Sequence, residues 1–302
     1  MSYMNSYLDL KLRISRKISD KMDLFERKTI KKMRNNGHLF FLSELIPYFK
    51  GTKLFMFGTG GSTTNLQNVS RLRNYNLMIV SLGPLYMYRV YNFMPNIWYL
   101  HYGPIARVLL EEEKKTPLDF SETFVFIPAN DSQSKIFFSS PIVKEFRRRH
   151  PEATFVLYRE KGDPITLDNI HSSYLYHGVE PLRALNGSNV ENTFLPMCAF
   201  LGASTLFFSG VDHLHSTGHF WDRNRFYQSM DGRKIDFPDE KLILKCASIA
   251  QAICAKKNIK CYRLEAKETV LKTYPYIDFE QALAQASPKI IPESIRKSYK
   301  TF

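Results

Sequence analysis

Residues 53–72 read KLFMFGTGGSTTNLQNVSRL, and this stretch decides the predicted fold. Leu54 to Phe57 form a short apolar run, which indicates a buried strand. Three glycines follow as a tight turn, and Ser62 or Thr63 then caps a predicted helix that continues to about Asn74. A strand, a glycine-rich turn and a helix in this order are typical of nucleotide-binding α/β domains.

The turn is also the first candidate binding site. Glycine lets the backbone approach a ligand, and a helix N-terminus offers free N–H groups to phosphate. The dinucleotide pattern G-x-G-x-x-G lacks its third glycine here, and no Gly-Lys-Ser/Thr occurs in the chain. A tight turn that binds nothing is the competing interpretation. The candidate nucleotide contacts of the turn are Gly58, Thr59, Gly60, Gly61 and Ser62.

Outward from this unit, strands and helices alternate along the chain. Further strands are expected at 76–81, 97–100, 124–127, 154–158, 206–209 and 259–264. Helices are expected at 39–49, 84–93, 104–115, 139–149, 195–201 and 240–256. This alternation predicts an α/β fold with a mostly parallel, Rossmann-like sheet covered on both faces. The long irregular segments 159–190 and 211–238 are candidate lids or binding loops.

Composition excludes several classes of protein. The chain has 302 residues and 44% hydrophobic residues, which is enough for a sizeable core and excludes wholesale disorder. No apolar run reaches the roughly 18 residues of a membrane span, and the first residues have no apolar core typical of a signal peptide. The four cysteines show no C-x-x-C spacing, so a reduced cytoplasmic chain is expected.

The net charge of +13 is concentrated near the N-terminus, where residues 11–34 hold ten basic and three acidic residues. Ile14, Ile18, Met22 and Phe25 fall on one face of a predicted helix. Such a helix either lies on an anionic membrane surface or packs on the core with a solvated face. We expect three units: a basic helical arm at 1–50, a Rossmann-like domain at 51–275 and a helical tail at 276–302. Nucleotide-sugar binding and catalysis are assigned to the middle unit by the family resemblance given below.

A second candidate site follows the strand at 206–209. The sequence Ser209-Gly210-Val211-Asp212 places a carboxylate at the carboxyl end of a strand, where α/β sheets bind ligands. The loop beyond it is rich in polar side chains: His213, His215, His219, Arg223, Arg225 and Tyr227. Three readings stay open for this loop: acid–base or phosphate chemistry, a metal site of the form H-x-H-x₃-H, or an exposed polar loop. Ser81 and Tyr102 are expected at the ends of two other strands, at the same edge of the sheet. Each is either a ligand contact or part of an ordinary turn.

The order of these pieces resembles the bacterial sialyltransferases of glycosyltransferase family 42, and equally the related domain of motility accessory proteins that modify flagellin. The opening Gly-Asn-Gly-Pro-Ser of the family corresponds to residues 58–62, and its later Ser-Gly-Ile-Asp to residues 209–212. Between them, a small polar pair corresponds to Asn192 and Thr193, and a helix end to Leu201-Gly202. The resemblance covers roughly residues 53–265.

The resemblance implies a GT-A-like sialyltransferase fold and transfer of an acidic ketose, sialic acid-like or Kdo-like, from a CMP donor to a cell-surface glycan. It also implies no metal and no cofactor, tyrosine hydroxyls on the donor phosphate, and a histidine base. This chain departs from the family pattern at Thr59 and Ser81, where the family has asparagine, and at Leu214, where it has tyrosine. No histidine follows His219 in the position of the family's base. The base is therefore expected among His219, His213 and His215, with Asp236 or Asp239 as the next candidates.

The implied partners are a nucleotide sugar, a glycan or lipid-linked acceptor and an anionic surface at the inner membrane face, in lipopolysaccharide or capsule biosynthesis. Nucleic acid is not expected, and a homo-oligomer is left open. One alternative is another nucleotide-using enzyme, a methyltransferase or a pyrophosphokinase, although Ser81 replaces the acidic residue that would hold a ribose. The other is a non-catalytic binder of nucleic acid or anionic lipid, which the charge favours although no RNP, KH or helix-turn-helix signature occurs.

Overall fold

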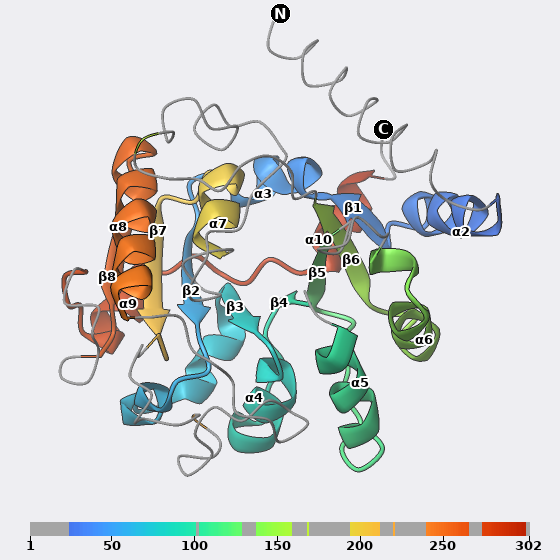
Figure 1. Ribbon diagram of the computed structural model, residues 1–302, viewed down its shortest axis with the longest axis horizontal. Coiled ribbons are helices and arrows are strands. Elements are labelled where there is room, and N and C mark those ends of the chain that lie inside the picture. Colours follow the sequence, from blue (N-terminus) through green and yellow to red (C-terminus); the bar gives the residue numbers. More distant parts are fainter. Residues whose placement is uncertain are drawn as a thin grey trace, which may run out of the picture.

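The computed structural model describes residues 24–100, 103–128, 137–158, 168, 194–211, 220, 240–265 and 274–299. These residues form an α/β fold around one eight-stranded sheet whose strand pairs are all parallel, in the order β1-β6-β5-β4-β3-β2-β7-β8 (Figure 1). The strands are β1 (Leu39–Phe41), β2 (Lys53–Phe57), β3 (Leu77–Val80), β4 (Ile97–Tyr99), β5 (Phe124–Pro128), β6 (Thr154–Tyr158), β7 (Thr205–Ser209) and β8 (Lys260–Arg263). The predicted α/β class with a parallel sheet is confirmed.

Helices cover both faces of the sheet and make three layers. The described helices are α2 (Leu24–Asn35), α3 (Ile46–Phe49), α4 (Gly83–Tyr91), α5 (Gly103–Glu112), α6 (Pro141–Arg149), α7 (Leu195–Leu201), α8 (Glu240–Lys256), α9 (Phe279–Gln285) and α10 (Pro292–Tyr299). One face packs against α3, α7 and α8, and the other against α4, α5, α6 and α9 (Figure 1). The predicted helices at 195–201 and 240–256 are confirmed with the same bounds.

The strands are apolar on both sides because each face of the sheet is buried. In β2, Leu54 and Met56 belong to the core on one face, and Phe55 and Phe57 to the core on the other. All four side chains are fully buried. A continuous apolar run rather than an alternating one is what a parallel sheet between two helix layers requires.

The segment that joins α9 to α10 covers the amino-terminal ends of the central strands, which we call the amino edge of the sheet. Asn76 and Asn96 are buried there, and the Asn96 side chain donates to the side chain of Asn76 at 2.9 Å. Their remaining groups bond to the backbone of Leu77, Pro288 and Ile290. Every polar atom of the pair thus finds a partner, which fixes the C-terminal segment to the starts of β3 and β4.

The predicted helix at 39–49 is wrong in its first half. Leu39–Phe41 instead form β1, which pairs with β6 at the edge of the sheet. A 3₁₀ helix (Leu42–Leu45) and the short α3 follow. The side chain of Glu44 accepts from the backbone N–H of Phe41 at 2.7 Å, so the turn is closed by a side chain rather than by a continuous helix. The apolar run was compatible with either structure, and pairing with β6 decided it.

The predicted helix from Ser62 to Asn74 is also wrong. Two 3₁₀ helices, Gly61–Asn65 and Val69–Asn74, take its place. Between them Asn68 adopts a left-handed conformation with φ of 57°, which an α-helix cannot contain. Gly60 is the N-cap of the first 3₁₀ helix, and no side chain caps it.

Other expectations lie outside what the structure describes. The apolar stripe at residues 14–25 falls on residues whose side chains are not described, so the role of the basic arm stays a prediction. The division into arm, catalytic domain and tail also stays a prediction. Across the described residues, no helix combines the length and apolar character needed to cross a membrane.

Arg296 of α10 packs against His38, and the free energy of unfolding is expected to depend on pH through this histidine. Burial lowers the pKa of His38 below its ordinary 6.5, and the Arg296 guanidinium acts in the same direction, against the Ala153 carbonyl and Glu152. Arg296 lies 3.2 Å from Nδ1 of this imidazole and donates to the Gly37 carbonyl at 3.0 Å. The folded protein therefore favours the neutral ring, and protons bind preferentially to the unfolded chain as the pH falls below 6.5.

We expect the wild-type free energy of unfolding to fall between about pH 7.5 and about pH 5.5, and to fall less steeply in His38→Gln, whose amide does not titrate in this range. Urea unfolding of both proteins at each pH measures the difference between them. Parallel curves would contradict this account of His38.

Candidate functional site

The topology creates one switch point, between β2 and β7. From β2 the chain proceeds through β3 to β6 on one side, and β7 then returns to the other side of β2. Open parallel sheets bind ligands at such a point, beyond the carboxyl ends of the strands. Both sequence-predicted motifs follow these two strands: the glycine turn follows β2, and Ser209-Gly210 ends β7.

Two glycines allow these motifs to touch. Phe57 of β2 is in register with Ser209 of β7, so Gly58 and Gly210 meet directly beyond the strands. A Cβ atom on Gly58 would lie 2.2 Å from the Gly210 carbonyl oxygen, and Gly210 has φ of +66°. The Gly60 N–H donates to the Gly210 carbonyl at 2.8 Å. Gly58 and Gly210 are thus required for close packing of the two loops, independently of any ligand.

A buried carboxylate joins three segments at this edge. Glu265, two residues beyond β8, is 5% exposed. Its Oε1 accepts from the Ser62 hydroxyl at 3.2 Å and from the Gly210 N–H at 3.0 Å. The Ser209 hydroxyl donates to the same oxygen. Buried charge is costly unless it is hydrogen-bonded, and here the bonds link the loops after β2, β7 and β8.

Sequence analysis missed Glu265. It stands alone in Leu264-Glu265-Ala266-Lys267, outside any motif, and 56 positions separate it from Ser209. The only available signal was a charged residue directly after a predicted closing strand. Its bonds also give the hydroxyl groups of Ser62 and Ser209 an internal role, because each donates its hydrogen to the carboxylate.

Ser81 lies at the same edge, directly after β3. It adopts a left-handed conformation with φ of 56°, unusual for a residue other than glycine or asparagine. Its carbonyl accepts from the indole N–H of the buried Trp98 at 2.8 Å, which stabilises this backbone. Strained residues of this kind gather at functional sites. The expected place of Ser81 after this strand is confirmed, and its role as a ligand contact stays a prediction.

A pocket of about 550 Å³ opens beside the glycine turn. One wall is formed by Asn65, the last residue of the first 3₁₀ helix, and by residues 66–68 after it. Another is formed by Tyr276 and residues 278–280 around the start of α9. Leu264 and Glu265 also line it. Glu265 therefore contacts the loops of the switch point and lines the pocket, so the two features are adjacent.

Twelve sequence-predicted site residues lie outside the described residues. They are Tyr102, Asn192, Thr193, Asp212, His213, His215, His219, Arg223, Arg225 and Tyr227, with the further base candidates Asp236 and Asp239. Of the predicted contacts, the structure brings together residues 58–62 and Gly210, with Ser81 at the same edge. Within the described ranges, no three or more His, Cys, Asp and Glu side chains are placed to hold a metal ion.

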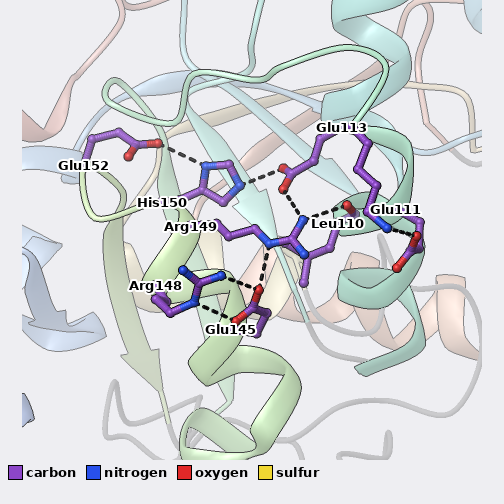
Figure 2. A network of polar contacts seen from close by, with 9 residues as sticks. Leu110, Glu111, Glu113, Glu145, Arg148, Arg149, His150 and Glu152 are labelled. Carbon is purple, nitrogen blue, oxygen red and sulfur yellow. Dashed lines mark hydrogen bonds and ion pairs between the residues drawn. The ribbon is translucent and has the colours of Figure 1, made fainter.

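A second polar cluster joins the ends of α5 and α6 (Figure 2). Its centre is His150, whose Nε2 lies 2.7 Å from Oε2 of Glu113, with both side chains buried. Hydrogen bonds from Arg148 and Arg149 lower the pKa of Glu145 to about 2. Because α6 ends just before β6 begins, this cluster lies at the amino end of the strands. Its members bind one another, so we interpret it as a structural link between helices.

Comparison with known proteins finds likeness only among solved structures, since no family model and no curated protein match the chain. The sialyltransferase CstII from Campylobacter jejuni, in complex with the substrate analogue CMP-3FNeuAc, is 13% identical; the match covers 83% of this chain and 100% of that chain, with a TM-score of 0.42. The MAf glycosyltransferase from Magnetospirillum magneticum AMB-1 is 11% identical; the match covers 88% of this chain and 41% of that chain, with a TM-score of 0.46. These are the two kinds of protein that the sequence motifs resemble.

The bonds of Glu265 predict a large effect of its removal. In Glu265→Ala, the hydroxyls of Ser62 and Ser209 and the N–H of Gly210 lose a buried acceptor. We expect the free energy of unfolding to fall by roughly 3 kcal/mol, since a buried polar group that loses its acceptor costs about 1–3 kcal/mol, and the Ser209 hydroxyl keeps its contact with the Thr63 hydroxyl. Urea unfolding measures the loss. The matched control is Glu111→Ala, which removes an exposed carboxylate on α5. Equal small effects of both substitutions would show that the Glu265 bonds contribute little.

Proposed function

We propose that this chain is a glycosyltransferase that transfers an acidic ketose, sialic acid-like or Kdo-like, from a CMP donor to a glycan acceptor. The donor's nucleoside is proposed to lie over the turn at residues 58–62, at the switch point of the sheet. The reaction is proposed to need neither a metal nor a cofactor.

The observation that carries this proposal is the meeting of two motifs far apart in sequence. Residues 58–62 and 209–212 correspond to two blocks of the family resemblance. Their described parts are bonded to each other through Gly58, Gly60, Ser209 and Gly210. A nucleotide bound at the switch point contacts the loops on both sides of it. The loops after β2 and β7 must therefore lie next to each other.

The chemistry at the turn favours the nucleoside over the phosphate. Ser62 and Ser209 are fully buried and donate to the Glu265 carboxylate, and the Ser209 hydroxyl also contacts the Thr63 hydroxyl, so these side chains hold the turn in shape beneath a ligand. A nucleoside over the turn would contact the partly exposed Thr59. A phosphate would be repelled by the buried negative charge. The 3₁₀ helix after the turn also lacks the length of an α-helix that would attract one.

The proposed base is His219, with His213 and His215 as the other candidates. A base is needed because the acceptor hydroxyl must lose its proton as the bond to the ketose forms. Arg223, Arg225 and Tyr227, in the same loop, are proposed to hold the departing phosphate in place of a metal. Asn192, Thr193, Tyr102 and Asp212 complete the proposed donor site.

The proposed place of action is the cytoplasmic face of the inner membrane, in the assembly of a surface saccharide. The basic arm supports this, because each Lys or Arg near an anionic surface contributes about 1 kcal/mol to binding. Lipid-linked acceptors would then be held close to the site.

Donor recognition is tested by thermal shift in the presence of CMP, CDP, UDP, GDP, S-adenosylmethionine and NAD. A ligand at 100 times its dissociation constant adds about 2.7 kcal/mol to the stability of the folded state, so CMP should raise the melting temperature most. Gly60→Val should abolish the CMP shift. The Gly60 backbone, at φ −66° and ψ 152°, is a conformation that valine adopts, and because Gly60 is buried the melting temperature of the ligand-free variant must first show that it folds.

The control is Ser121→Val, which places the same side chain ahead of β5 at the amino edge of the sheet. It should keep the CMP shift. Stabilisation by S-adenosylmethionine or another nucleotide in place of CMP would favour the alternative nucleotide-using enzymes. Binding of none of the six, or a full CMP shift in Gly60→Val, would overturn the proposed donor site.

A further inference from the structure

The pocket beside the glycine turn has a chemistry of its own. Its polar lining consists of side-chain amides and carboxylates: Asn65, Gln67, Asn68, Asp278, Glu280 and Glu265. No Lys, Arg or His is among the described residues that line it. This is unusual for a chain with a net charge of +13. The lining itself carries three carboxylates, and the cations next to it are Arg71, which is paired with Glu280, and Arg263, which lies over the Tyr276 ring. Phosphate and carboxylate groups are therefore disfavoured at the Glu265 and Asp278 side of the pocket.

An aromatic side chain stands at the same pocket. Tyr276 is 47% exposed, and among the described residues it is one of two large hydrophobic side chains that are exposed. The Arg263 guanidinium lies 5.8 Å from the centre of this ring, and the side chain lines the pocket. Aromatic side chains are common in the lining of small-ligand sites. A flat ring next to amides and carboxylates matches a pyranose, which has apolar C–H faces and a rim of hydroxyls that donate and accept.

The walls of the pocket are held in place without a ligand. Beside Tyr276, the Arg263 N–H donates to the Pro275 carbonyl and the Ile277 N–H to the Arg263 carbonyl, each at 3.0 Å. These bonds fix the backbone of Tyr276 next to the end of β8. Across the pocket, Arg71 forms an ion pair with Glu280 and joins the second 3₁₀ helix to α9. The pocket is thus largely pre-formed, as small-ligand sites usually are.

We propose that this pocket binds an uncharged sugar unit of the acceptor, with Tyr276 as the stacking platform. The inference rests on the proposed function, because it assigns the second substrate of the same reaction. The donor carries a phosphate and a carboxylate, and the acidic lining excludes both. A neutral saccharide meets no such penalty. Glu265 lies between the proposed donor site and the pocket. Its carboxylate accepts hydrogen bonds from the switch-point loops, and the residue also lines the pocket.

Saturation-transfer NMR with the full chain tests this directly, in the absence of any nucleotide. The neutral probes are lactose, maltose and chitobiose, and the anionic probe is lactobionate. At least one neutral disaccharide should bind, and lactobionate should bind more weakly than lactose. Tyr276→Ala should weaken binding about tenfold, or ~1.4 kcal/mol, whereas Tyr276→Phe should retain it because the ring remains.

The matched control is Val90→Ala on α4, which truncates the other large hydrophobic side chain that is exposed among the described residues, at 49%. It should leave saccharide binding unchanged. Binding of none of the neutral probes, equal binding of lactobionate, or equal effects of Tyr276→Ala and Val90→Ala would each overturn the proposal.

The CMP thermal shift, measured on the same samples, distinguishes failure of this proposal from failure of the proposed donor site. Saccharide binding through Tyr276 without a CMP shift supports this pocket and contradicts the donor site.

Discussion

One buried carboxylate organises the carboxyl edge of this sheet. Glu265 accepts from Ser62, Ser209 and Gly210, and so holds together loops that follow β2, β7 and β8. Without it, three buried donors would lose this acceptor at the place where Gly58 packs against Gly210, although the Ser209 hydroxyl would keep its contact with the Thr63 hydroxyl. The candidate donor site and the pocket beside it both depend on this arrangement.

Polar side chains have different partners at the amino ends and at the carboxyl ends of the strands. The amino edge is closed by Asn76 and Asn96, which bind the C-terminal segment through side-chain and backbone bonds. The cluster around His150 links the helix ends on that side (Figure 2). Polar groups at the amino edge thus bind one another and stabilise the fold. At the carboxyl edge, polar side chains instead line a pocket open to a ligand, which is where parallel sheets place their sites.

Much of the fold could be predicted because its signals are local. Apolar runs such as Leu54–Phe57, bounded by glycines, identified the strands, and α7 and α8 were found with their bounds. The errors arose where distant contacts decide the structure. Leu39–Phe41 became a strand because β6 offered an edge, and Asn68 interrupted a helix that the sequence after the turn favoured. In the candidate site, the loops after β2 and β7 could be predicted from the glycine turn and from Ser209-Gly210. Glu265 could not, because its role comes entirely from residues that are distant in sequence.

The most direct test of the central claim is amide hydrogen exchange at Gly58, Gly60 and Gly210, followed by NMR in the wild-type chain. These N–H groups donate to the Ser209 carbonyl, the Gly210 carbonyl and the Glu265 carboxylate, at 2.8, 2.8 and 3.0 Å. If the carboxylate holds the three loops as one unit, all three amides should exchange as slowly as those of the central strand β2, through unfolding of the whole domain. Exchange of the Gly210 amide at the rate of an open loop, while β2 stays protected, would contradict the account.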